Sequence, residues 1–264
     1  MLTQLVNAFL LSTAVAMVAF WRRSLSGSGV LAALLVGTVI YGGGGWQWGV
    51  LLGLFFVTSS LLSHFKAEEK RTAAEKFDKG HQRDSGQVLA NGGLGALLAL
   101  LTVVVPSPLW AWAFTGVMAT VTADTWATEL GTLSKQPPRL ISNGRVVEVG
   151  TSGGISPLGT AISLLGGLFI GLAAGLMGMG PTVGRTAVAG ALSGLVGSLF
   201  DSLLGATVQQ IYYCDTCQKE TERKIHTCGT ATRPLRGWSW LNNDLVNLIA
   251  SLVGGATAVF LLTG

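Results

Sequence analysis

The sequence has little charge. Only 11% of its 264 residues are charged, whereas soluble domains carry about 25%. Hydrophobic residues make up 49% of the chain, which also contains 37 glycines. This composition excludes a soluble globular enzyme, a disordered chain and a nucleic-acid-binding module. The isoelectric point of about 9.2 is attributed to Lys and Arg that flank membrane helices, with no nucleic acid as partner. The composition predicts a polytopic protein of the lipid membrane.

Charge is also missing from residues 1–20, which Trp21, Arg22 and Arg23 follow. A signal peptide carries its positive charges before the apolar stretch. The order in this chain is typical of a first membrane-spanning helix whose C-terminal end is anchored in the cytoplasm. A signal peptide is the less favoured alternative.

Long apolar stretches predict an all-α transmembrane helix bundle of seven or eight spans, forming a single integral membrane domain over 1–264. A span needs about 20 apolar residues. The stretch from Val30 to Tyr41 is short and has a re-entrant segment as its alternative. The predicted spans are 4–21, 28–45, 46–62, 88–105, 109–130, 155–176, 184–211 and 243–262.

The positive charges predict the orientation of the bundle. Eight spans bring the loops 63–87, 131–154 and 212–240 to one side of the membrane. All of the 17 Lys and Arg residues except Arg185 then lie on that side, which we expect to be cytoplasmic and to carry the active face. The membrane is expected to be a plasma membrane or a thylakoid-type inner membrane.

The individual charges of the loop 63–87 are expected to be solvated. They would lie on an extension of the preceding helix.

Acidic residues occur where they are costly. Asp124, Glu129 and Asp201 lie within predicted spans, and Asp244 begins the last one. An ionised side chain near the bilayer centre costs about 2.5–3.5 kcal/mol, so each carboxylate is protonated, paired across helices or bound to a cation. A hydrogen bond between helices is the purely structural alternative. Carboxylate oxygens with several waters are the environment that Mg²⁺ prefers.

Glycine-rich turns and basic residues follow or precede these spans. Exposed N–H groups at the start of a helix favour anions, and buried acids beside such loops suit phosphoryl transfer. The turn at 79–83 is also basic. The turns are Asn91-Gly92-Gly93, Ser142-Asn143-Gly144-Arg145 and Gly150-Thr151-Ser152-Gly153-Gly154, and the bases are Arg83, Lys135, Arg139 and Arg145.

All three cysteines lie in the loop 212–240. Cys214 and Cys217 are two residues apart in the pattern Cys-x-x-Cys, and His226 and Cys228 follow. A reducing compartment argues against disulfides, and this set offers the ligands of a Cys₃His zinc site. A structural zinc ion is one interpretation. A redox pair and a chance cluster are the others.

Several strings resemble the signatures of a known family. They are Ala123–Gly131, Ser134–Ile141, Gly150–Ser156, Asp201–Thr207, Trp240–Asp244, and Gly80–Asp84 followed by Gln87–Gly93. The family is that of the integral membrane proteins that include the phytyl-phosphate kinase of tocopherol synthesis. The resemblance implies transfer of a phosphoryl group from CTP or another nucleoside triphosphate to an isoprenoid monophosphate, such as phytyl phosphate, giving phytyl diphosphate.

The resemblance also implies roles for individual residues. Asp124 and Asp201 would hold Mg²⁺ and, with Glu129 and Lys135, form the catalytic set. Lys135 or Arg139 would contact the nucleotide phosphates. Substrate or nucleotide binding would fall to Arg83, Asn91, Gly92, Gly93, Arg139, Gly153, Gly154, Asn243 and Asp244.

Two other functional classes compete with a kinase. In an ion-coupled transporter the intramembrane carboxylates would be ion or proton sites, and inverted repeats would support that interpretation. The surroundings of Asp124 and Asp201 share only a loose Asp-Thr or Asp-Ser pattern. A scaffold organised by the cysteine loop would explain zinc but not the acidic residues. The kinase is the leading hypothesis.

Overall fold

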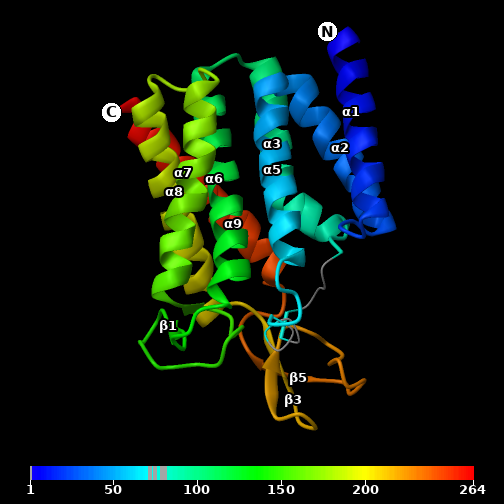
Figure 1. Ribbon diagram of the computed structural model, residues 1–264, viewed down its shortest axis with the longest axis vertical. Helices are drawn as coiled ribbons and strands as arrows, with labels where there is room; N and C mark the ends of the chain where they lie inside the picture. The colour runs from blue at the N-terminus through cyan, green and yellow to red at the C-terminus, as the bar shows by residue number, and fades with distance from the viewer. Residues whose placement is uncertain (1, 71–72, 74–75, 78–81) are drawn as a thin grey trace.

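The computed structural model describes residues 2–70, 73, 76–77 and 82–264. Within them, long helices run side by side as a bundle (Figure 1), which confirms the predicted all-α polytopic fold. Seven of these helices are long and apolar enough to cross a membrane. The helices are α1 (Leu2–Trp21), α2 (Gly27–Gly44), α3 (Trp46–His64), α5 (Ser85–Val104), α6 (Pro108–Gly131), α7 (Pro157–Leu176), α8 (Val183–Thr207) and α9 (Asn243–Thr263).

The helix α2 decides between the alternatives for the second stretch. It is continuous over 18 residues and qualifies as a membrane span by length and composition. The helix α6 is 24 residues long and carries both Asp124 and Glu129. Its C-terminal half is polar. For this reason α6 is the one long helix of the described chain that is not among the seven apolar enough to cross a membrane.

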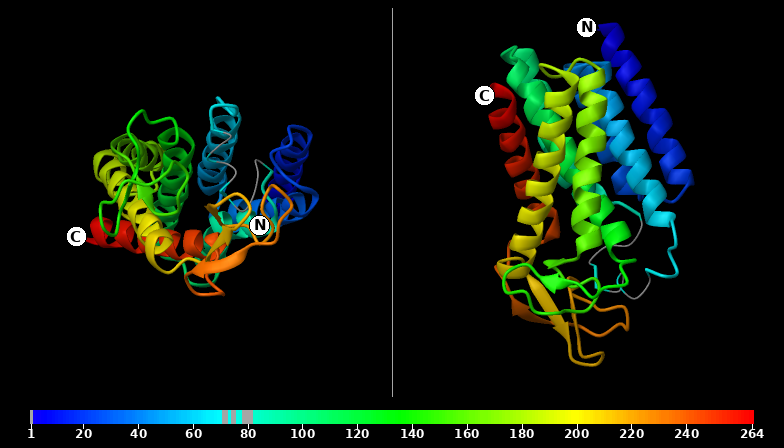
Figure 2. Two further views of the ribbon diagram at one scale, coloured as in Figure 1. Left: turned by 90° about the horizontal axis from the view of Figure 1, so that it is seen from below. Right: turned by 60° about the vertical axis from the view of Figure 1, so that its left-hand side comes forward.

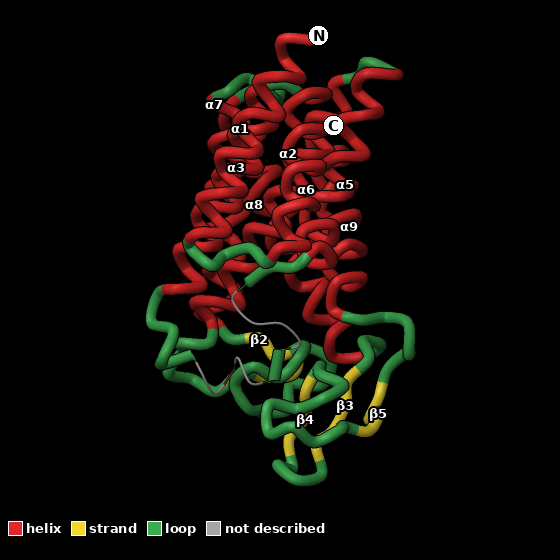
Figure 3. The backbone as a smooth tube through the Cα atoms, turned by 90° about the vertical axis from the view of Figure 1, so that its right-hand side faces the viewer, coloured by secondary structure: helices red, strands yellow, loops and turns green. Residues whose placement is uncertain are grey.

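Consecutive helices alternate in direction, so the long loops gather at one end of the bundle and the chain termini lie at the other (Figures 1 and 3). The loop end also holds the turn between α1 and α2, with Arg22 and Arg23, whereas Arg185 lies in the first turn of α8 at the opposite end. The described positive charges therefore gather on one side, as the sequence predicts. That this side is cytoplasmic stays a prediction.

Two small antiparallel sheets lie among these loops. Strand β1 (Arg139–Leu140) pairs with β2 (Gly154–Ile155), and a second sheet has the order β4-β3-β5, with β3 at Ile211–Cys214, β4 at Lys219–Thr221 and β5 at Arg233–Arg236. The predicted span 184–211 is therefore too long. Helix α8 ends at Thr207, and Ile211 pairs with Arg236 in the sheet. Hydropathy alone does not separate a short apolar strand from the end of an apolar helix.

The start of α5 also differs from the prediction. Asp84 Oδ1 accepts a hydrogen bond from the Gln87 N–H at 2.9 Å, and Gln87 Oε1 accepts one from the Asp84 N–H at 3.3 Å. This capping box begins the helix at Ser85. The segment 91–93 thus lies inside the helix and does not open it. Its N–H groups belong to the helical hydrogen-bond ladder and are not offered to an anion.

The bundle has two parts, which are seen from below in Figure 2 (left). One contains α1, α2 and α5, and the other contains α6, α7, α8 and α9. Helix α3 lies between them, lines a cavity together with the first group and packs against α6 of the second. In the second part, glycines let backbones touch: a Cβ on Gly190 of α8 would lie 2.4 Å from the Cα of Gly171 on α7. Trp48 of α3 stacks on Phe114 of α6, with ring centroids 4.1 Å apart, and joins the two parts.

Candidate functional site

A polar cavity of about 300 Å³ opens where the helices meet the loop end. Helices α5, α6, α7, α8 and α9 contribute to its wall, together with the loops that follow α3, α6 and β4. Most of the predicted site residues meet here. Those that line the cavity are Arg83, Asn91, Asp124, Glu129, Gly153, Gly154, Asp201, Asn243 and Asp244.

Asp124 and Asp201 lie in the C-terminal halves of α6 and α8, toward the loop end of the bundle. Ser198 Oγ donates to Asp124 Oδ1 at 3.4 Å, and Asp201 Oδ2 is buried without a hydrogen-bond partner among the described residues. The two carboxylates are close enough for their charges to interact. A buried acceptor without a partner is costly, and a bound cation would remove that cost. This donor set therefore fits Mg²⁺, which takes one or two carboxylates plus substrate oxygens.

Glu129 has partners of its own. Ser63 Oγ donates to its Oε1 at 2.6 Å, and the Lys70 ammonium pairs with its Oε2. Lys70 is only 5% exposed and also donates to the carbonyl of Leu62 at 2.7 Å. Because an unpaired buried charge is unstable, Lys70 and Glu129 hold each other at the cavity wall.

The expectation that the charges of 63–87 are solvated is therefore wrong for Lys70, and also for Lys76. Lys76 is 6% exposed, and its Nζ donates to Glu148 Oε2 at 2.7 Å and to Thr151 Oγ1 at 3.2 Å. The hydrogen bond from Lys76 lowers the pKa of Glu148. These pairs tie the loop after α3 to α6 and to the glycine-rich loop before α7.

Arg83 lies at the edge of the cavity just before α5. Its backbone is fixed, because its carbonyl accepts from the Ser26 N–H at 3.0 Å and its N–H donates to the Ser24 carbonyl at 2.9 Å. Its guanidinium donates to Ser60 Oγ at 3.0 Å. Burial lowers the pKa of this guanidinium to about 10, against the opposing charge of Glu129, so it is still protonated at neutral pH. Residues 79–81 of the predicted basic turn lie outside the described residues.

The glycine-rich loop before α7 closes another side of the cavity. Gly150 and Gly153 adopt φ values of +81° and +83°, the left-handed region that favours glycine. A Cβ on Gly153 would lie 2.5 Å from the backbone nitrogen of Ala206 in α8. Glycine at this position lets the loop backbone lie directly against α8, beside Asp201.

Other predicted residues lie elsewhere. Lys135 and Arg139 are exposed and are not among the described residues that line the cavity. Arg139 donates to the Gly144 carbonyl at 3.0 Å, within the β1 turn. Gly92 faces α2, where a Cβ would lie 2.7 Å from Val36, and Gly93 faces open space.

Glu222 lines the cavity although the sequence does not point to it. It follows β4, its carboxylate accepts from Gln209 Nε2 at 2.8 Å, and it lines the cavity together with Gln87 and Lys70. No local pattern separates Glu222 from the other charges of its loop, because the sheet alone carries it to the cavity.

A second cavity, of about 270 Å³, lies between α1, α2, α3 and α5. Its wall is apolar and includes Val36 and Phe56. It shares three residues with the polar cavity, namely Arg83, Gln87 and Asn91. Gln87 and Asn91, four residues apart, lie on one face of the start of α5, and Arg83 lies directly before this helix. The two cavities are thus adjacent, and the polar stripe formed by Arg83, Gln87 and Asn91 belongs to the walls of both.

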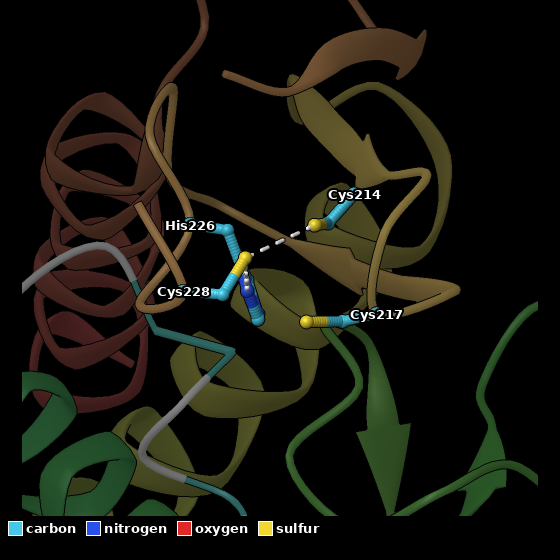
Figure 4. A group of neighbouring side chains, drawn as sticks. All are labelled: Cys214, Cys217, His226 and Cys228. Carbon is cyan, nitrogen blue, oxygen red and sulfur yellow. Dashed lines mark hydrogen bonds between the residues drawn. The ribbon is translucent and has the colours of Figure 1, made fainter. Parts of the chain in front are cut away.

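The predicted metal-binding side chains also come together, away from the cavity (Figure 4). One ligand atom from each of Cys214, Cys217, His226 and Cys228 lies within 4.8 Å of all the others. The three cysteines are free thiols. The structure thus brings together the four residues that the sequence offers as candidate zinc ligands, and zinc binding stays a prediction.

Comparison with known proteins identifies relatives. A family model described as integral membrane protein DUF92 matches residues 10–255. The chain is 32% identical to Protein PGR of Arabidopsis thaliana, over 95% of this chain and 93% of that protein. It is 34% identical to an uncharacterized membrane protein of Methanocaldococcus jannaschii, over 90% and 86%. Protein VTE6, chloroplastic, of Arabidopsis thaliana is 26% identical over 90% of this chain and 65% of that protein. No solved structure matches.

Proposed function

This chain belongs to the integral membrane protein DUF92 family, and on that premise we propose that it transfers the terminal phosphoryl group of CTP or another nucleoside triphosphate to an isoprenoid monophosphate. Phytyl phosphate, which would become phytyl diphosphate, is the proposed acceptor. The observation that carries the proposal is the shared wall of Arg83, Gln87 and Asn91 between an acid-lined polar cavity and an apolar one.

The shared wall suits a substrate with a charged head and an apolar tail. An isoprenoid chain would lie in the cavity between α1, α2, α3 and α5, whose wall offers Val36 and Phe56. The phosphate would then reach Arg83, whose planar guanidinium suits the binding of phosphate oxygens. We therefore assign acceptor binding to Arg83, with Gln87 and Asn91 beside it.

The acidic side of the cavity suits the donor. Asp124 and Asp201 would hold Mg²⁺, an ion that neutralises charge on the phosphates of the donor and on the transferred group. The glycine-rich loop at 150–154, and Asn243 and Asp244 of α9, complete the wall around the two carboxylates. The strings that carry the family resemblance thus include Asp124, Asp201, Gly153 and Asp244, all of which line this one cavity.

The chemistry needs positioning more than proton transfer. An oxygen of the acceptor phosphate attacks the terminal phosphorus of the donor, a new O–P bond forms, and the bond to the nucleoside diphosphate breaks. The nucleophile is already anionic, so no strong general base is required. Arg83 would orient the acceptor, and the Lys70–Glu129 pair would keep the loop after α3 closed over the cavity. The active face would be cytoplasmic, where nucleotides are available.

The experiment is an assay of the purified full-length protein in lipid vesicles. Phytyl phosphate is supplied with Mg²⁺ and with CTP, ATP, GTP or UTP in turn, and the lipid product is identified by mass spectrometry. We expect phytyl diphosphate with at least one donor. An ion-coupled transporter would instead show uptake driven by an ion gradient and no phosphoryl transfer with any donor, a result that would overturn the proposal. Vesicles that carry Arg83→Ala protein serve as the control for acceptor binding.

A further inference from the structure

We propose that a Zn²⁺ ion bound by Cys214, Cys217, His226 and Cys228 holds the β3–β5 sheet together and so keeps Glu222 at the polar cavity. The proposal concerns a structural metal and does not depend on which reaction the cavity performs. The four side chains come from two turns. They offer sulfur and nitrogen ligands for a structural ion, whereas Asp124 and Asp201 offer carboxylate oxygens for the proposed Mg²⁺.

The distances between the ligand atoms match a tetrahedral zinc site. Bonds of about 2.3 Å to sulfur and about 2.0–2.1 Å to nitrogen place neighbouring sulfurs about 3.8 Å apart and a sulfur and a nitrogen about 3.6 Å apart. Cys214 Sγ lies 3.7 Å from Cys228 Sγ, and His226 Nδ1 lies 3.3 Å from Cys228 Sγ. A disulfide would need about 2.05 Å, so the thiols are not joined at this spacing. The histidine nitrogen beside the three sulfurs completes the Cys₃His set that zinc takes, whereas a redox pair needs only two thiols.

The two ligand pairs lie on two tight turns that are built alike. Cys214 and Cys217 belong to the turn between β3 and β4, which Gln218 closes with φ +54°. His226 and Cys228 belong to a turn bracketed by a bridge between residues 225 and 231, which Gly229 closes with φ +83°. A left-handed residue directly after each second ligand bends both backbones around one point. The ligands are therefore preorganised for a single ion.

The sheet is too small to be stable by its own core. Its strands have four, three and four residues, and three strands need a hydrophobic face or a packed partner to be stable on their own. Ile211 of β3 is 2% exposed, but Leu235 of β5 is 40% exposed and Ile225 beside the sheet is 65% exposed, so the apolar core of the sheet is small. A structural zinc ion commonly supplies the missing stability in such a case.

The sheet in turn supports the cavity. Thr221 Oγ1 and the Glu222 N–H both donate to the Lys76 carbonyl, at 3.1 and 2.9 Å, and Arg223 Nε donates to the Phe77 carbonyl at 2.7 Å. Phe77 and Glu222 line the polar cavity. Loss of the ion would release these contacts together, loosening one wall of the site without removing any group from α6 or α8.

Metal analysis and cobalt exchange test the site in the wild-type protein. Full-length protein purified without chelator should contain about one zinc ion per chain. Exchange with Co²⁺ should give the intense visible bands and the thiolate-to-cobalt absorption of a tetrahedral, sulfur-rich site. Protein that holds no zinc and shows no such cobalt spectrum would refute the proposal, and so would a disulfide found between any two of the three cysteines.

A pair of variants separates ligand loss from general damage. Cys217→Ser should lose bound zinc and become at least about ten times more sensitive to trypsin at Lys219, Arg223 and Lys224. Thr227→Ala changes a residue between two ligands, offers no ligand atom, and should keep its zinc and its resistance.

If Cys217→Ser does not fold, the same comparison is made on wild-type protein with and without chelator, followed by re-addition of Zn²⁺. We expect trypsin sensitivity to rise on removal and to fall on re-addition. Chelated protein as resistant as the zinc-loaded form, or Cys217→Ser with one zinc per chain, would contradict the proposal.

Discussion

The two parts of the helix bundle are packed in different ways. In the part formed by α6, α7, α8 and α9, a Cβ on Gly167 or Gly171 would lie 2.5 or 2.6 Å from a backbone oxygen of α8. Of the 18-residue apolar segment of α7, 44% is buried. In the part formed by α1, α2 and α5 together with α3, the buried share of the apolar segment is 17% for α1 and 28% for each of the other three helices. A Cβ on Gly43 of α2 would lie 2.7 Å from a backbone oxygen of α5, but Gly53 of α3 faces open space.

This difference matches what the proposed function would require each part to hold. Carboxylates that share a cation must keep a fixed geometry, and close backbone packing through small residues supplies it in a membrane. An apolar chain needs room and access from the bilayer, and loosely packed helices supply that. The acids Asp124 and Asp201 belong to the tight part, whereas the apolar cavity belongs to the loose part. Added side-chain volume should therefore be harmful in the tight part, whereas the loose part should adjust its shape to it.

The largest effect is expected from the acids of the tight part. Asp124→Asn and Asp201→Asn keep side-chain size and hydrogen bonding but remove an anionic ligand of the proposed Mg²⁺ site. Each should lower turnover per folded molecule at least about 100-fold, or roughly 2.7 kcal/mol, across a Mg²⁺ titration. Asp215→Asn is the matched control, because its exposed pair with Arg233 is worth little. Near-wild-type turnover in both helix variants would exclude the metal role.

A smaller effect is expected from the glycine contact of the tight part. Gly190→Ala puts a Cβ 2.4 Å from the Cα of Gly171, so α7 and α8 must separate. Overpacking of this kind costs about 1–3 kcal/mol, and thermal unfolding in detergent should show it as a lower midpoint. Gly184→Ala on the same helix has no heavy atom within 4 Å of its new Cβ and should unfold at or slightly above the wild-type temperature. Equal loss in both variants would show that the close contact is not the cause.

The smallest effect is expected in the loose part. Gly53→Leu fills space in the wall of the apolar cavity and should raise the KM for a long isoprenoid monophosphate about tenfold, or about 1.4 kcal/mol. The KM for a short, five-carbon prenyl phosphate should not change, because that chain does not reach Gly53. Gly184→Leu, at the opposite end of the bundle, controls for added bulk. An equal rise in KM for both substrates would argue against a tail-binding cavity.

The sequence is sufficient to predict the helices, because an apolar run of the right length has few alternatives in a membrane. The gathering of the charged loops at one end follows from the same runs and from Arg22 and Arg23. The acids Asp124 and Asp201 are also identifiable, since a carboxylate inside a span is costly enough to need a reason. Their meeting in one cavity agrees with that reasoning.

The loops are less predictable because their structure depends on distant partners. Lys70 resembles any solvated loop charge until Glu129, on α6, is placed beside it. Glu222 reaches the cavity only through the sheet. Conversely, Lys135 and Arg139 have the charge expected of phosphate contacts but lie exposed. The capping box at Asp84 begins α5 at Ser85 and so places Gly92 inside the helix. There Gly92 packs against α2 and does not bind an anion at a helix start.

The stripe of Arg83, Gln87 and Asn91 has a consequence for where in the bilayer a reaction can occur. Arg83 lies directly before α5, and Gln87 and Asn91 lie in its first turns, so a headgroup that they bind is held at one depth, near the interface. A lipid bound in this way would keep its hydrocarbon chain in the membrane throughout. Moving the chain into water would cost about 0.8 kcal/mol for each CH₂ group. Under the proposed function, a water-soluble donor and a lipid acceptor would therefore meet at this depth without either leaving its own solvent.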